Sequence, residues 1–171
     1  MIFDGRWKRE LKLLVWEISI WKTMPILGSV AEHRLNRAIL YSATILRKII
    51  EDEIEAEDIA KETNIPLPKL KTTHAILNAI KYPYVGEEGW VVRSTLCASD
   101  YGKGQDVCVK AKDVCNWLLH SYVWGVARDA NTKKFVGFLV ASDFDKEKFI
   151  HFISLDEWNS LLKHVIENGK F

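Results

Sequence analysis

The sequence places an asparagine and a histidine where they could act together on a phosphate or a ribose. Asn116 and His120 lie four positions apart in the run Cys-Asn-Trp-Leu-Leu-His. On a helix, side chains with this spacing share one face. An imidazole can move a proton, so the pair indicates a nuclease-like or phosphate-ester enzyme, with Lys110 or Lys112 as a further basic group.

The same two residues resemble part of the R-N-x-x-x-H motif of HEPN-type ribonucleases, which use helical scaffolds. The resemblance covers only residues 115–120, and Cys115 stands where the motif has its arginine. The resemblance implies catalytic roles for Asn116 and His120 but supplies no residue to hold the phosphate. In the alternative interpretation, Asn116 caps or bridges a loop and His120 hydrogen-bonds at a helix end, where the helix dipole favours its charged form.

No other residues have the spacing of a known metal or cofactor site. The histidines lack H-E-x-x-H and H-x-H spacings, and the cysteines lack a C-x-x-C pair. Asp143, Asp145 and Glu147 lack the glycine and the closing acid of a calcium loop. The glycines form neither a dinucleotide fingerprint nor a P-loop. We therefore expect no metal and no cofactor.

Composition limits the partners and the compartment. The chain has 24 basic and 23 acidic residues, so no overall field attracts it to nucleic acid or to a membrane surface. No apolar run approaches the length of a membrane-spanning helix. Three cysteines form no disulfide framework, which indicates a cytoplasmic protein. We expect no membrane partner, and nucleic-acid binding only if a local patch provides for it.

The first expected helix ends before Pro25 and is apolar on two sides. One stripe holds Trp7, Leu11, Leu14, Ile18 and Trp21, and an opposite stripe holds Leu13, Trp16 and Ile20. The domain core covers one stripe. The other is covered either by the rest of the same chain or by a second subunit.

A second helix is expected from Ser29 to about Glu53, and it has a basic side. This side carries Arg34, Arg37, Tyr41 and Lys48. It could bind an acidic partner or single-stranded nucleic acid, or form a solvated face or one side of a protein interface. Acidic residues follow Lys48 on the same side of the helix, which disfavours the binding of a nucleic-acid strand along it.

Strands follow the helices. The pattern predicts strands at 71–76, 90–96 and 106–109, a helix at 112–120, and an antiparallel meander at 122–128, 134–142 and 148–154. Ser154 and Glu157 form a capping box for a final helix. We therefore expect an α+β fold with N-terminal helices, an antiparallel β-meander and a C-terminal helix. It forms a single domain over 1–171, helical over 5–62 and mixed, sheet-containing over 69–171.

The sequence is consistent with two different functions. The favoured one is a non-catalytic protein-interaction or regulatory module that binds protein, in the simplest case itself as a homodimer, through Leu13, Trp16 and Ile20. The alternative is the enzyme that uses His120 and Asn116.

Overall fold

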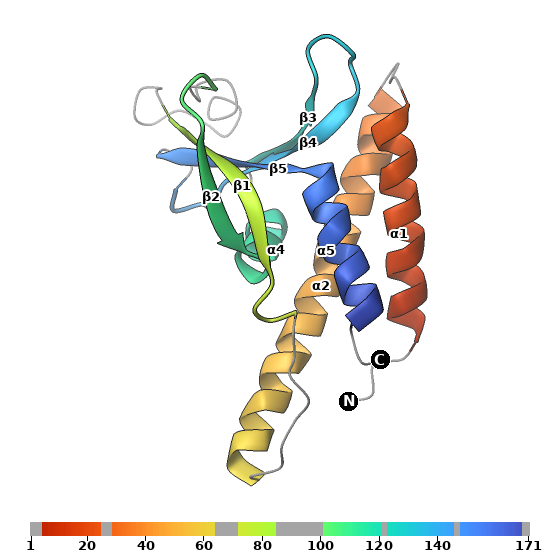
Figure 1. Ribbon diagram of the computed structural model, residues 1–171, viewed down its shortest axis with the longest axis vertical. Helices are drawn as coiled ribbons and strands as arrows, with labels where there is room; N and C mark the ends of the chain where they lie inside the picture. Colours follow the sequence, from red (N-terminus) through yellow and green to blue (C-terminus); the bar gives the residue numbers. More distant parts are fainter. Residues whose placement is uncertain are drawn as a thin grey trace.

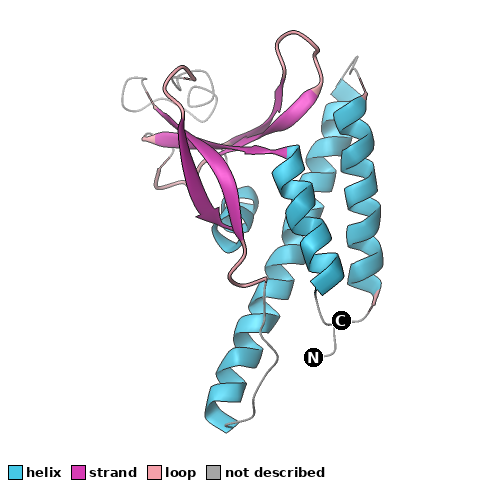
Figure 2. Cartoon of the chain, in the orientation of Figure 1, coloured by secondary structure: helices cyan, strands magenta, loops and turns pink. Residues whose placement is uncertain are grey.

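The computed structural model describes residues 5–24, 29–63, 72–84, 101–120, 123–145 and 148–168. Two long helices come first, strands and a short helix follow, and another helix closes the described chain (Figures 1 and 2). The bounds are α1 Arg6–Thr23, α2 Ser29–Thr63, β1 Ile76–Pro83, β2 Gln105–Lys110, α4 Ala111–His120, β3 Trp124–Arg128, β4 Phe135–Val140, β5 Phe149–Ser154 and α5 Leu155–Asn168. The predicted α+β class, with N-terminal helices, antiparallel strands and a C-terminal helix, is confirmed.

The described strands form one antiparallel sheet in the order β2-β1-β5-β4-β3. The predicted meander is the β3-β4-β5 part of this sheet. Strand β1 pairs with β5, for example at Ile80 and Phe152, and so adds the β1-β2 pair to the meander. The sheet therefore has more strands than the meander that the sequence predicted.

Strand β1 begins later than the sequence predicted. The predicted strand 71–76 overlaps β1 only at Ile76, because residues 72–74 form a bend and a turn. The buried carboxylate of Glu53 on α2 accepts hydrogen bonds from the backbone N–H and the hydroxyl of Thr73, both at 2.7 Å. The polar groups of Thr73 are thus satisfied by α2 rather than by a neighbouring strand. The predicted strand 90–96 lies outside the described residues.

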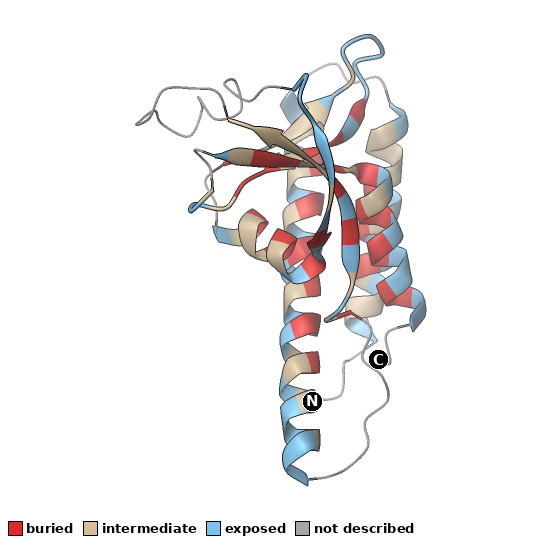
Figure 3. Ribbon diagram, turned by 60° about the vertical axis from the view of Figure 1, so that its left-hand side comes forward, coloured by how far each residue is buried: buried red, intermediate tan, exposed pale blue. Residues whose placement is uncertain are grey.

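Each of the long helices buries one apolar face that its periodicity predicts. On α1, the buried side chains are Leu11, Leu14 and Ile18. Complete burial of a leucine or isoleucine side chain stabilises a fold by about 1.5–3 kcal/mol. On α2, the buried residues end at Glu53, and the last turns of this helix extend beyond the core (Figure 3).

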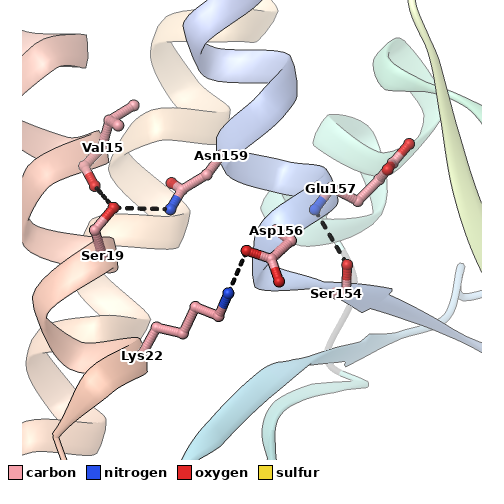
Figure 4. Close-up of polar contacts among 7 residues, drawn as sticks. All are labelled: Val15, Ser19, Lys22, Ser154, Asp156, Glu157 and Asn159. Atoms are coloured by element: carbon pink, nitrogen blue, oxygen red, sulfur yellow. Dashed lines mark hydrogen bonds and ion pairs between the residues drawn. The ribbon is translucent and has the colours of Figure 1, made fainter.

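Helix α1 is held to α5 by polar contacts as well as by the core (Figure 4). The amide of Asn159 donates to the hydroxyl of Ser19 at 3.2 Å, and this hydroxyl donates to the carbonyl of Val15 at 2.7 Å. The ammonium group of Lys22 pairs with the carboxylate of Asp156 at the start of α5. These contacts fix which side of α1 faces the domain.

The capping box at the start of α5 is only half formed. The backbone N–H of Glu157 donates to the hydroxyl of Ser154 at 3.1 Å, as a helix N-cap requires (Figure 4). The carboxylate of Glu157 does not close the box, because it accepts hydrogen bonds from the backbone N–H and side-chain amide of Asn78 at 2.8 and 3.0 Å. Glu157 therefore links α5 to β1.

Candidate functional site

The second stripe of α1, formed by Leu13, Trp16 and Ile20, is not buried by the described part of the chain. The side chain of Leu13 is 60% exposed and that of Trp16 is 65% exposed. Ile20 is half-buried. Met24 continues the stripe at the end of the helix and is 49% exposed. We call Leu13, Trp16 and Ile20 the α1 stripe.

A groove runs between α1 and α2, and it begins at the α1 stripe. Its volume is about 820 Å³. Leu13 lines it from α1, and Arg37 and Tyr41 line it from α2. We call it the α1-α2 groove; its other lining residues are Glu10, Leu14, Glu17, His33, Asn36, Leu40, Thr44 and Trp124. The structure thus brings together one residue of the predicted interface and two residues of the predicted basic side of α2.

The other two residues of that basic side, Arg34 and Lys48, do not line the groove. Both are exposed on α2, as the sequence predicted. The ammonium group of Lys48 lies 2.8 Å from the carboxylate of Asp52, which raises the pKa of Lys48. Arg37 lies 3.6 Å from the carboxylate of Glu17 across the groove. Acidic partners within the chain therefore already engage two of the three cations on this side.

A second candidate site lies at the end of α4. Helix α4 buries Val114, Cys115 and Leu118, which leaves Asn116 half-buried and His120 exposed. These two predicted residues line one pocket of about 360 Å³, which we call the α4 pocket. Its other lining residues are Arg47, Trp117, Ser142, Asp143 and Phe144.

Arg47 is the functional candidate that sequence reasoning missed. It lies on α2, which packs against α4 (Figure 1), and its Nη1 contacts Nε2 of His120. A guanidinium group only donates hydrogen bonds, so Nε2 of His120 is the acceptor in this contact. Nε of Arg47 also donates to the carboxylate of Glu51 at 2.9 Å. Glu51 and His120 therefore orient the guanidinium group at the pocket.

Cys115 does not replace the missing arginine of the HEPN-type motif. Its side chain is fully buried, and burial raises the pKa of its thiol to about 12, against a smaller opposite effect of nearby Arg47. The arginine beside His120 comes instead from α2. Lys110 and Lys112, the basic groups that the sequence suggested, are exposed and do not line the α4 pocket.

None of the described helices has the length and apolar composition needed to cross a membrane. Within the described ranges, no group of three or more His, Cys, Asp or Glu side chains is placed to hold a metal ion. The chain matches no family model, no curated protein and no solved structure. No relative supplies a function, so only the chemistry of these two surfaces bears on it.

Proposed function

We propose that the protein is a non-catalytic interaction module that forms a homodimer through the α1 stripe and the α1-α2 groove. The observation that carries this proposal is the exposure of Leu13 and Trp16, at 60% and 65%, on a helix whose opposite face is buried in the core. Tyr41, which is 42% exposed, adds an aromatic ring at the groove.

Burying the exposed side chains of the α1 stripe against another protein surface would be favourable in free energy. Complete burial of a large apolar side chain contributes about 1.5–3 kcal/mol, and aromatic residues are enriched at protein interfaces. Association itself costs about 4–15 kcal/mol, so a stable dimer needs several such side chains to be buried together. A two-fold contact buries the stripes of both copies, and the groove residues can add to the contact area.

A second copy fits this surface because the stripe is self-complementary. Leu13, Trp16 and Ile20 follow the alternating spacing of three and four residues that helices use when they pack lengthwise. In a two-fold dimer the same patch faces itself, so an antiparallel pair centred near Trp16 would set Leu13 of one copy beside Ile20 of the other. The groove carries Glu10, Glu17 and Arg37, charges of both signs, so two copies can meet without like charges opposing throughout.

The test is the molar mass in solution, measured by sedimentation and light scattering over micromolar concentrations. We expect the wild-type mass to rise toward that of a dimer, and Trp16→Glu and Leu13→Glu to remain monomeric. Because both side chains are exposed, each variant should keep a free energy of unfolding within about 0.5 kcal/mol of the isolated wild-type monomer.

Ile59→Glu is the matched control, because Ile59 is 53% exposed near the far end of α2 and lies outside the stripe and the groove. This variant should dimerise like the wild type. A wild-type protein that stays monomeric throughout, or a Trp16→Glu variant that still dimerises, would rule out this function.

A further inference from the structure

Three kinds of side chain line the α4 pocket. Hydrogen-bond donors come from α2 and α4, a carboxylate comes from the turn after β4, and aromatic rings come from α4 and from the same turn. The donors are Arg47, Asn116 and His120, the carboxylate is Asp143, and the rings are Trp117 and Phe144. This surface is separate from the α1-α2 groove, and no lining residue is shared.

The donors are suited to a phosphate group. Arginine is the preferred residue for phosphate because its planar guanidinium group can donate several hydrogen bonds at once. The contacts of Arg47 with Glu51 and His120 leave further N–H donors on the same group. Asn116 adds an amide donor on the same helix face as His120, and all three side chains line the pocket.

Asp143 decides between a bare phosphate and a larger ligand. A carboxylate in a pocket for inorganic phosphate would repel it, because both are negatively charged. A carboxylate is, however, the group that proteins use to accept hydrogen bonds from ribose hydroxyls. The presence of both Arg47 and Asp143 in the lining therefore favours a ligand that carries both a phosphate and a sugar.

Phe144 supplies the third element of such a ligand. Its side chain is 90% exposed, in the turn that also carries Asp143. Aromatic rings of this kind bind nucleobases by stacking, whatever the base. The polar, partly charged pocket beside it makes a nucleobase a better occupant than an aliphatic chain.

We propose that the α4 pocket binds a nucleoside phosphate, with the phosphate at Arg47, Asn116 and His120, the ribose toward Asp143 and the base against Phe144. The volume of about 360 Å³ suits a ligand of mononucleotide size. The proposal does not depend on the homodimer, because its residues lie outside the α1 stripe and the groove.

Calorimetric titration of the whole chain with adenosine monophosphate, adenosine and inorganic phosphate tests it. We expect the monophosphate to bind at least about tenfold more tightly than either fragment. Arg47→Gln and Phe144→Ala should each weaken its binding by about tenfold or more. Phe144 is too exposed to hold the fold together, so loss of binding in that variant reports the ligand contact.

Lys112→Gln is the matched control, because Lys112 is an exposed cation of α4 outside the pocket. Its affinity should equal that of the wild type. The proposal is wrong if the wild type does not bind the monophosphate, if inorganic phosphate binds as tightly, or if Lys112→Gln loses as much affinity as Arg47→Gln.

A free nucleotide and the end of an RNA strand present the same chemistry to this pocket. Titration with a short single-stranded RNA separates the two sources. If the RNA binds about tenfold more tightly than the monophosphate, and if Phe144→Ala loses this binding, the pocket is a site for the end of an RNA strand. Equal or weaker binding of the RNA assigns it to the free nucleotide.

Discussion

The imidazole ring of His151 on β5 lies parallel to the indole ring of Trp117 on α4, with centroids 4.7 Å apart and an angle of 10° between the planes. Phe149 meets the same imidazole edge-on at 5.3 Å. Trp117 also lines the α4 pocket. The stack therefore joins the buried face of the sheet to the wall of the candidate nucleotide site.

His151 should make the fold less stable in mild acid. Burial, with a smaller contribution from repulsion by Lys81, lowers the pKa of His151 from 6.5 to about 4, and Asp145 opposes the change. Its Nδ1 has no hydrogen-bond partner among the described residues. Since the folded-state pKa is below the unfolded one, the unfolded chain takes up the proton first as the pH falls. The free energy of unfolding should thus decrease between about pH 6.5 and about pH 4, by about 1–3 kcal/mol from this residue.

Urea denaturation across this pH range measures the effect, and His151→Phe is the control. Phenylalanine keeps an aromatic ring against Trp117 but cannot be protonated. The difference in the free energy of unfolding between the two proteins isolates His151 from the carboxylates, which titrate in both. A pH dependence that is the same in both proteins would contradict the prediction.

Ser42 and Trp158 should show strong coupling in stability. The indole N–H of the fully buried Trp158 on α5 donates to the hydroxyl of Ser42 on α2 at 2.9 Å, and that hydroxyl donates to the carbonyl of Ile39 at 2.8 Å. Ser42→Ala leaves the indole N–H buried without its acceptor, which should lower the free energy of unfolding by about 1–3 kcal/mol. Urea denaturation followed by far-ultraviolet circular dichroism measures it.

For comparison, the same Ser42→Ala change is made in a Trp158→Phe protein, which lacks the indole N–H donor. Ser42→Ala should be less destabilising there than in the wild type, because no indole N–H is left unpaired. An equal loss in both backgrounds would show that the hydrogen bond contributes nothing beyond packing.

Cys115 should resist alkylation in the folded protein, whereas Cys108 should react. Cys115 is fully buried and its thiol has a pKa of about 12, while Cys108 is exposed on β2. The thiolate is the reactive form, so Cys115 lacks both access and charge. Iodoacetamide labelling with peptide mapping by mass spectrometry should find Cys108 modified first, and Cys115 modified only in denaturant. Equal labelling rates without denaturant would mean that α4 opens readily at this position.

The sequence predicted those features that depend on neighbouring residues. The spacing of Leu11, Leu14 and Ile18 correctly indicated the buried face of α1, because helical periodicity is set by hydrogen bonds four residues apart. The same local rule placed Asn116 and His120 on one face of α4. The error in the start of β1 has the opposite origin, since the turn at Thr73 is held by Glu53, twenty residues earlier.

Only the tertiary structure decided which surfaces and partners these elements have. The sequence showed that α1 has two apolar stripes, but the packing of α1 against α2 and α5 determined that Leu13 and Trp16 are the exposed ones. Arg47 precedes His120 by 73 residues, and no local pattern joins them. Secondary structure follows from contacts along the chain, which the sequence displays, whereas the groove and the pocket arise from contacts across it, which depend on how the finished elements pack.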